Sequence, residues 1–169
     1  MRSTDVLIEA FGRIQALAHE AVDGLTPDQL AFRIDSRANP IAWLVWHAAR
    51  VQDDHVAGVA ATEQVWTAGS WFEQFQLPFG PEATGFGQST DDVAAVQVRS
   101  GELLTGYVDA VHDATLSFLG RVSDDDLDRI VDASWDPPVS LGARLVSVVS
   151  DDLQHVGQAA LIRGLIGRG

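Results

Sequence analysis

The sequence of 169 residues contains neither cysteine nor lysine, and both absences narrow the chemistry open to the protein. Without cysteine there is no disulfide, no thiolate zinc site and no cysteine nucleophile. Without lysine there is no amine for a Schiff base or for the attachment of pyridoxal phosphate. The reactive side chains that remain are five histidines, the carboxylates and the hydroxyls.

Positive charge and long hydrophobic runs are also scarce. The 11 basic residues, all arginine, face 24 acidic residues, which gives a formal charge of −13. Clustered positive charge favours the binding of nucleic acids, so we expect a small-molecule partner and no nucleic acid. No stretch approaches the roughly 18 uncharged apolar residues that a spanning helix needs, and Asp5 and Glu9 interrupt any N-terminal signal core. We therefore expect a cytoplasmic protein without a membrane partner.

The first half of the chain contains two segments in which apolar residues recur three or four positions apart, the spacing of an amphipathic helix. The first segment predicts a helix from about residue 3 to 22, ended by Gly24. The second predicts a helix that ends near Ala60. Its start is marked by Asn39 as the N-cap and Pro40 at the first helical position.

The second half of the chain repeats this spacing twice, and no run of alternating apolar and polar residues predicts a strand. A third long helix is expected to begin at Ser89 and to continue to about Leu119. Ser140 is a suitable N-cap for a fourth. Four amphipathic helices, with connections that allow antiparallel neighbours, predict an all-α four-helix bundle. We expect one domain over residues 1–169.

Residues 64–89 form a long connection between the second and third predicted helices. Connections longer than about 15 residues are uncommon unless they cover a site or an interface. This one is rich in aromatic residues, which either fill one end of the core or form a lid over a site: Trp66, Trp71, Phe72, Phe75, Phe79 and Phe86.

Two histidines lie inside apolar stretches, where a polar ring needs a partner. His47 shares the inward face of its helix with Leu44 and Val51. His155 lies four residues after Asp151, and an i,i+4 pair projects from one helix face with Cβ atoms about 6 Å apart. Asp151 and His155 are therefore placed to bind one metal ion together, and His47 adds a third ligand from a facing helix. Three protein ligands leave a position open, as in a catalytic metal site.

Simpler interpretations of these residues also exist. A lone inward histidine is more often a core residue bonded to a carbonyl or a carboxylate. Asp151 and His155 on their own are compatible with a helical ion pair worth about 0.3 to 0.5 kcal/mol. An inward carboxylate among apolar neighbours is harder to explain in this way, because burying an unpaired charge is costly.

His55 and the adjacent Asp53 and Asp54 compete for the same role. Asp54 lies nearly on the face of His47, but two helical turns separate them by roughly 10 Å, too far to share one ion. We interpret Asp54 as an ion-pair partner of Arg50. Two further histidines are predicted to lie on the surface: His19 and His112.

At these residues the sequence resembles the DinB/YfiT-like superfamily, four-helix bundles proposed to be metalloenzymes, which includes the N-terminal domain of mycothiol-dependent maleylpyruvate isomerase. One motif is PIAWLVWHAARVQDDH, which carries the family histidine at His47. The other is DDLQHVGQAALIRG, similar to the family pattern H-x-x-x-H-x-G-Q, with His155, Gly157 and Gln158 in place. The resemblance covers nearly the whole chain and implies the same bundle fold.

Asp151 departs from that pattern, which usually has histidine there. A carboxylate oxygen ligates zinc at about 2.0 to 2.2 Å, so the count of three ligands is preserved. We expect a divalent metal held by His47, Asp151 and His155, with zinc first and nickel, manganese or iron as alternatives, since a carboxylate shifts the preference toward harder ions. Loss of the metal is the other outcome that the substitution allows.

The resemblance implies a thiol-dependent transferase. Because the chain has no cysteine, the sulfur must arrive on a low-molecular-weight thiol such as mycothiol or bacillithiol. Two alternatives remain: a hydrolase that uses metal-bound water, and a non-catalytic bundle that binds a small molecule or a partner helix. The resemblance also implies a homodimer.

Overall fold

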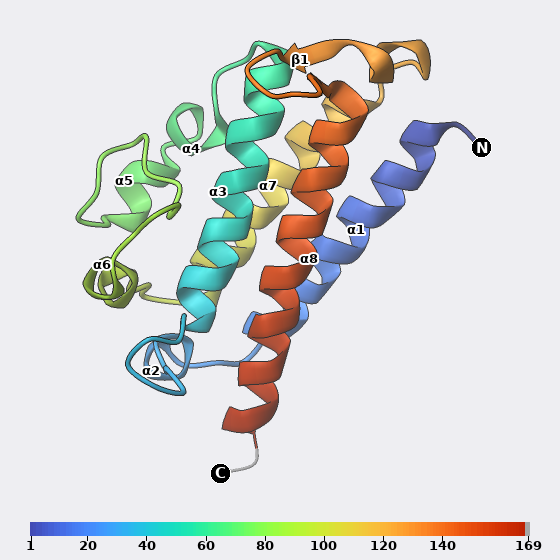
Figure 1. Ribbon diagram of the computed structural model, residues 1–169. Coiled ribbons are helices and arrows are strands. Elements are labelled where there is room, and N and C mark those ends of the chain that lie inside the picture. The colour runs from blue at the N-terminus through green and yellow to red at the C-terminus, as the bar shows by residue number, and fades with distance from the viewer. Residues whose placement is uncertain (168–169) are drawn as a thin grey trace.

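The computed structural model describes residues 1–167, and four long helices lie side by side in it (Figure 1). They are α1 (Ser3–Val22), α3 (Ile41–Ala60), α7 (Gly101–Leu119) and α8 (Leu141–Ile166). Both α7 and α8 pack against α1 and α3, which closes the bundle around one core. The predicted all-α four-helix bundle is confirmed. No helix of the described residues combines the length and hydrophobicity needed to cross a membrane.

The long connection decides the direction of the third long helix. It leaves the upper end of α3 and descends beside the bundle, so that α7 starts at the lower end and runs parallel to α3 (Figure 1). Antiparallel packing is therefore found between α3 and α8 and between α1 and α7, while the consecutive helices α3 and α7 are parallel neighbours.

Short elements occupy the connections. The helices among them are α2 (Pro27–Leu30), α4 (Val65–Ala68), α5 (Trp71–Phe75), α6 (Thr90–Ala95) and the 3-10 helix η1 (Asp125–Asp128). Two strands, β1 (Ile130–Asp132) and β2 (Val139–Ser140), pair antiparallel between η1 and α8. These strands are too short to show a period of two, which is why the sequence pattern did not predict them.

The predicted third helix was wrong in its first part, because α6 and α7 are separate helices divided by residues 96–100. Val96 and Val98 are buried and the residue between them is exposed, which is the alternation of extended chain. Gly101 then starts α7 against the end of α1. A Cβ on Gly101 would lie 2.5 Å from Cγ1 of Val22, so only glycine allows this approach.

The helix ends follow the local signals with one exception. Gly24 takes φ +70° just after α1, and the Ser140 hydroxyl accepts a hydrogen bond from the Ala143 amide at the start of α8. Pro40, not Asn39, is the N-cap of α3, and no side chain caps this helix. The predicted role of Asn39 was therefore wrong.

The aromatic residues of the connection mostly fill the core. Trp66 and Phe75 are buried, and others pack against the core while partly exposed: Trp71, Phe72 and Phe79. Phe86 is the exception, since 92% of it is exposed. The interpretation of the aromatics as core residues therefore holds for all of them except Phe86.

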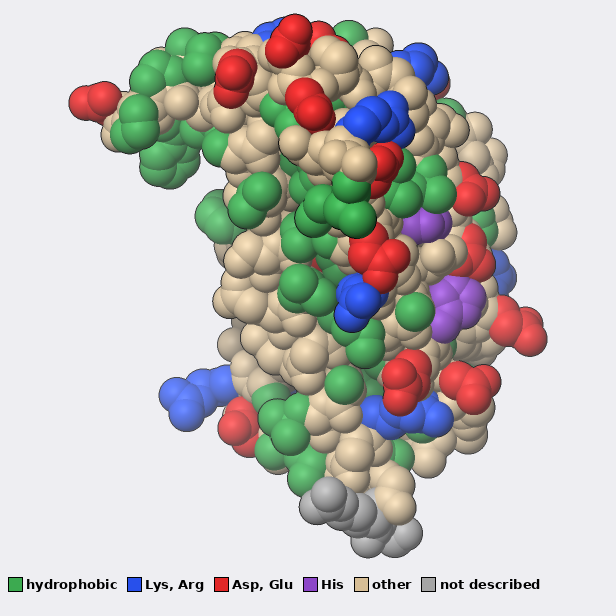
Figure 2. Space-filling model, turned by 90° about the vertical axis from the view of Figure 1, so that its right-hand side faces the viewer, with side chains coloured by type: hydrophobic (Ala, Val, Ile, Leu, Met, Phe, Trp, Pro, Cys, Tyr) green, Lys and Arg blue, Asp and Glu red, His purple; other side chains and the backbone are tan. Residues whose placement is uncertain are grey.

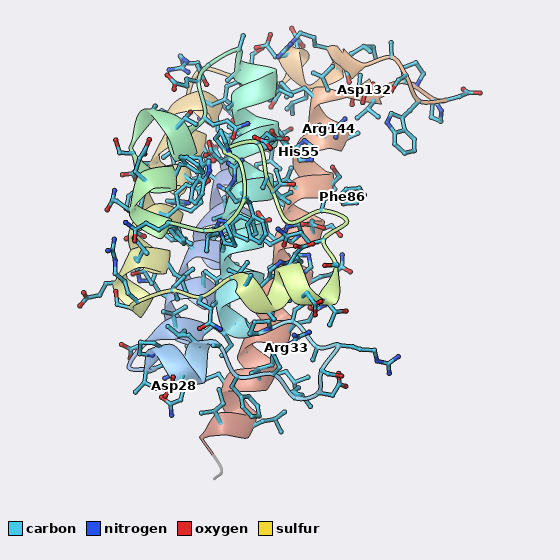
Figure 3. The ribbon with its side chains drawn as sticks, turned by 90° about the vertical axis from the view of Figure 1, so that its left-hand side faces the viewer. Asp28, Arg33, His55, Phe86, Asp132 and Arg144 are labelled. Atoms are coloured by element: carbon cyan, nitrogen blue, oxygen red, sulfur yellow. The ribbon has the colours of Figure 1, made fainter. Side chains whose placement is uncertain are left out.

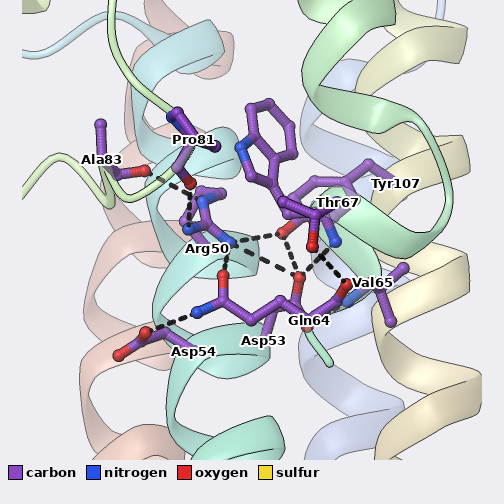
Figure 4. Close-up of polar contacts among 10 residues, drawn as sticks. Arg50, Asp53, Asp54, Gln64, Val65, Thr67, Pro81, Ala83 and Tyr107 are labelled. Atoms are coloured by element: carbon purple, nitrogen blue, oxygen red, sulfur yellow. Dashed lines mark hydrogen bonds and ion pairs between the residues drawn. The ribbon is translucent and has the colours of Figure 1, made fainter. Parts of the chain in front are cut away.

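A buried arginine fastens this connection to α3 (Figure 4). Arg50 is fully buried, and its Nε donates to the Ala83 carbonyl at 3.0 Å. Its two terminal nitrogens donate to the Pro81 carbonyl at 3.3 Å and to the Gln64 side-chain oxygen at 2.8 Å. The guanidinium also lies over the Trp66 ring, 5.1 Å from its centre. One side chain thus holds both ends of the connection.

Asp53 supplies the opposite charge. Its carboxylate lies 3.5 Å from Arg50 and is 3% exposed. It accepts hydrogen bonds at 2.8 Å from the amides of Val65 and Trp66, the first residues of α4, and from the Tyr107 hydroxyl. Burial, together with the neighbouring Asp53 charge, raises the pKa of Tyr107 well above its usual value, so that this hydroxyl stays a donor.

The partner of Arg50 predicted from the sequence was wrong. Arg50 pairs with Asp53, three residues ahead, because both lie on the buried face of α3. Asp54 points to the side of the helix, where its carboxylate accepts a hydrogen bond from Gln64 at 2.8 Å.

Replacing Asp53 with alanine is expected to lower the free energy of unfolding by about 3 to 5 kcal/mol, because Arg50 then stays buried without its counter-ion. Urea denaturation measures this change. Glu9→Ala is the control, since Glu9 and Arg13 form an exposed pair whose loss leaves stability nearly unchanged. Equal effects of the two substitutions would contradict the role given to Asp53.

Candidate metal centre

Helices α3 and α8 bring the three predicted ligands together. His47 comes from α3, and Asp151 and His155 come from successive turns of α8. One ligand atom of each lies within 4.8 Å of the other two. Nε2 of His155 is 3.7 Å from a carboxylate oxygen of Asp151, and the rings of His47 and His155 meet edge to face with centres 4.8 Å apart. That these residues hold a metal ion stays a prediction.

The backbone of the long connection sets the orientation of His47. Its Nδ1 lies 2.5 Å from the Thr84 carbonyl, so this nitrogen carries the proton and donates it. Nε2 is left with a free lone pair. Burial lowers the pKa of His47, which keeps the ring neutral, and a neutral ring is the form that ligates a metal. Metal-bound histidines commonly donate their second nitrogen in this way.

A glycine makes the contact between Thr84 and His47 possible. Gly85 has φ +95°, a conformation that side chains other than glycine rarely adopt. A Cβ here would lie 2.7 Å from Nδ1 of His47, and within 3.2 Å of the rings of Trp43 and Trp46. The connection therefore reaches the histidine only because this position has no side chain.

Trp43 forms one wall of the site. Its ring stacks on His47 with centres 4.4 Å apart and meets the edge of His155 at 5.9 Å. Its indole nitrogen donates to the side-chain oxygen of Gln88 at 2.7 Å. The tryptophan thus fixes both imidazoles and ties a second point of the connection to the site.

Two polar atoms of the cluster fit a bound cation. Oδ2 of Asp151 is buried and has no hydrogen-bond partner among the described residues, although it lies beside His155. A buried carboxylate oxygen without a donor is costly. A divalent cation would satisfy it, and a set of two imidazole nitrogens and one carboxylate oxygen suits zinc and also iron, manganese or nickel. Nδ1 of His155 likewise lacks a partner among these residues.

The cluster opens into a cleft of about 480 Å³ between α3 and α8. The cleft has a mixed lining of ionisable, hydroxyl and apolar side chains, which are those of His47, Val51, Asp54, His55, Thr84, Phe86, Ser147, Val148 and Asp151. Figure 3 shows Asp132, Arg144, His55 and Phe86 following one another along this side of the molecule. His55 therefore lines the same cleft as His47 and Asp151 without joining the cluster of predicted ligands.

The two remaining histidines lie elsewhere. His19 is partly exposed and contacts Asp109 at 2.7 Å, in line with its predicted surface position. The surface prediction for His112 was wrong, because this side chain is 8% exposed and burial lowers its pKa. It follows Val108 by four residues, which places it at the edge of the apolar stripe of α7.

Sequence reasoning missed Asp152. It is fully buried, and neither of its carboxylate oxygens has a hydrogen-bond partner among the described residues. Burial, and then the charge of Asp151, raises its pKa well above the usual value, which favours the neutral acid. The spacing carried the signal, since Asp152 lies four residues after Val148 and four before Val156, on the inward stripe of α8.

Gly85→Ala is expected to displace the connection from His47 and to weaken metal binding by about 10- to 100-fold, the usual effect of losing the partner of a ligating histidine. Competition with a metal-sensitive dye measures the affinity for Zn²⁺. Gly58→Ala on α3 is the matched control, because a Cβ there meets nothing within 4 Å. Unchanged affinity in the Gly85 variant would show that Thr84 does not orient the ligand.

Comparisons with known proteins agree with this architecture. A sequence model of the DinB superfamily matches residues 10–159. A solved structure, described as a conserved protein from Enterococcus faecalis, superposes with a TM-score of 0.93 at 27% identity, covering 100% of this chain and 99% of that one. A search of curated proteins found no significant match. Because this match spans residues 10–159, most of the sequence, this chain belongs to the DinB superfamily.

Proposed function

We propose that this protein is a metal-dependent enzyme that uses a low-molecular-weight thiol, of the mycothiol or bacillithiol type, as the nucleophile of a transfer reaction. The observation that carries the proposal is the buried, unpartnered oxygen of Asp151 beside two imidazoles at an open cleft. Membership of the DinB superfamily supports it.

His47, Asp151 and His155 would hold the metal, with zinc as the first candidate. Three protein ligands leave a coordination position for a ligand from the cleft. A divalent metal in such a site lowers the pKa of a thiol or a water molecule bound to it. The charge of Asp151 would offset part of the charge of the ion, while imidazole ligands add none.

The chain's own residues prepare the site for this role. The Thr84 carbonyl holds the Nδ1 proton of His47, which keeps the Nε2 lone pair free. Trp43 covers His47 on one face and excludes water from that side. The cleft between α3 and α8 gives a small molecule access to the remaining side.

The composition points to an external thiol. The sequence has no cysteine, so a sulfur nucleophile can reach this site only on a cofactor or a substrate. No thiol of the chain competes for the ion either. An acidic, cysteine-free protein that contains a histidine and carboxylate cluster is thus suited to bind a thiol without being modified by it.

Metal analysis of purified protein tests the ligand set. One divalent ion per chain is expected in the wild type and less than a tenth of that in His47→Ala and in Asp151→Ala. His19→Ala is the control, since His19 is partly exposed and bonded to Asp109, outside the cluster. Retention of stoichiometric metal by both ligand variants would overturn the assignment.

Thermal-shift measurements with mycothiol and bacillithiol test the nucleophile. The melting temperature of the metal-loaded protein is expected to rise with one of these thiols, and the rise is expected to vanish in Asp151→Ala. Serine in place of the thiol compound is the negative control. Hydrolytic turnover that needs the metal and is indifferent to thiol would replace the proposal with a hydrolase.

A further inference from the structure

The cleft extends away from the metal centre along two antiparallel helices, and corresponding positions of these helices face each other across it. On α3, His55 follows His47 by eight residues, which is about 12 Å along the helix axis. On α8, Ser147 precedes Asp151 by one turn. Because the helices run in opposite directions, His55 and Ser147 mark the same end of the cleft, and His47 and Asp151 mark the other.

The middle of the cleft is apolar. Val51 and Val148 line it between the two ends, and neither can make a hydrogen bond through its side chain. Phe86 stands at the rim with 92% of its surface exposed, although the other aromatic residues of the connection pack against the core. An exposed ring at the edge of an apolar cleft offers a contact surface to a bound ligand.

The far end of the cleft is polar and has free hydrogen-bonding capacity. The His55 ring makes no hydrogen bond with the described residues, and burial and the Arg144 cation lower its pKa, so it is a neutral donor and acceptor. The Ser147 hydroxyl donates to the Arg144 carbonyl at 2.8 Å and keeps its oxygen lone pairs for a ligand.

The charges around the cleft disfavour a ligand that carries a negative charge at the end near His55 and Ser147. Its lining contains two acidic side chains, Asp54 and Asp151, and no arginine. Arg144 lies close to His55, but its guanidinium is bound to Asp132 of β1 at 2.9 Å. A carboxylate or phosphate at the far end would therefore meet no free cation of the lining, whereas a hydroxyl or an amide would find partners.

We infer that this cleft takes an elongated small molecule with a metal-binding head, an apolar middle and an uncharged hydrogen-bonding tail that contacts His55 and Ser147. The inference rests on the proposed function, because the head is placed by the metal. It names the class of thiol that the metal would hold: a molecule with an uncharged tail, long enough to span two helical turns.

Binding of ω-mercapto alcohols to the Co²⁺-loaded protein tests the inference. The thiolate-to-cobalt absorption band reports the dissociation constant of each probe without any need for turnover. We expect 6-mercapto-1-hexanol to bind at least about tenfold more tightly than 2-mercaptoethanol, because only the longer probe covers the apolar middle. We expect 1-hexanethiol and 6-mercaptohexanoate to bind more weakly than the six-carbon alcohol.

Two variants test whether the uncharged tail of the ligand binds at His55 and Ser147. His55→Ala and Ser147→Ala are each expected to weaken the binding of 6-mercapto-1-hexanol by about three- to tenfold, the effect of one lost hydrogen bond. The affinities for 2-mercaptoethanol and for Co²⁺ are expected to stay unchanged. His19→Ala is the matched control outside the cleft. Ser147 is exposed, so its variant is a test that is independent of any effect of His55 on folding.

The outcomes separate the two proposals. Failure to bind Co²⁺ would overturn the proposed function and with it the inference. Binding of Co²⁺ and 2-mercaptoethanol, with no gain from chain length or hydroxyl and no loss in the His55 and Ser147 variants, would overturn the inference alone. Tighter binding of 6-mercaptohexanoate than of the alcohol would contradict the uncharged tail.

Discussion

The buried Arg50–Asp53 pair is the constraint on which the rest of this structure depends. A guanidinium with no exposure to water must find its partners within the protein, and it finds them in the backbone of the long connection. Asp53 does the same with the amides that begin α4. A segment of forty residues between α3 and α7, residues 61–100, is thereby held against one helix at two places, and it brings α7 back parallel to α3.

The candidate metal centre follows from that attachment. Arg50 and His47 lie one turn apart on α3, so the carbonyl that binds Arg50, that of Ala83, immediately precedes Thr84, whose carbonyl orients His47. Gly85 completes the approach because no side chain fits there. The core of the bundle and the geometry of the site are therefore coupled: the interactions that stabilise the connection also select the tautomer of His47, a candidate ligand.

Two adjacent acidic residues on α8 show how environment divides their roles. Asp152 faces the core, where burial favours its neutral form, whereas Asp151 faces the cleft and keeps an oxygen for an ion. The segment between η1 and α8, which includes Asp132, projects outward at one end of the molecule and carries hydrophobic side chains (Figure 2). Its Trp135 is exposed. Nothing in the described residues covers that projection.

The sequence by itself determined the four amphipathic helices, most of their ends and the three candidate ligands, because helical periodicity and i,i+4 spacing are local properties. It also excluded thiolate ligands outright. Only the tertiary structure decided that Asp53 and not Asp54 pairs with Arg50, that Asp152 and His112 are buried, that residues 96–100 break the third helix, and that His55 shares the cleft. Each of these depends on which elements pack together. The spacing of apolar residues along a helix does not fix, to within a fraction of a turn, how that helix is rotated against its neighbours.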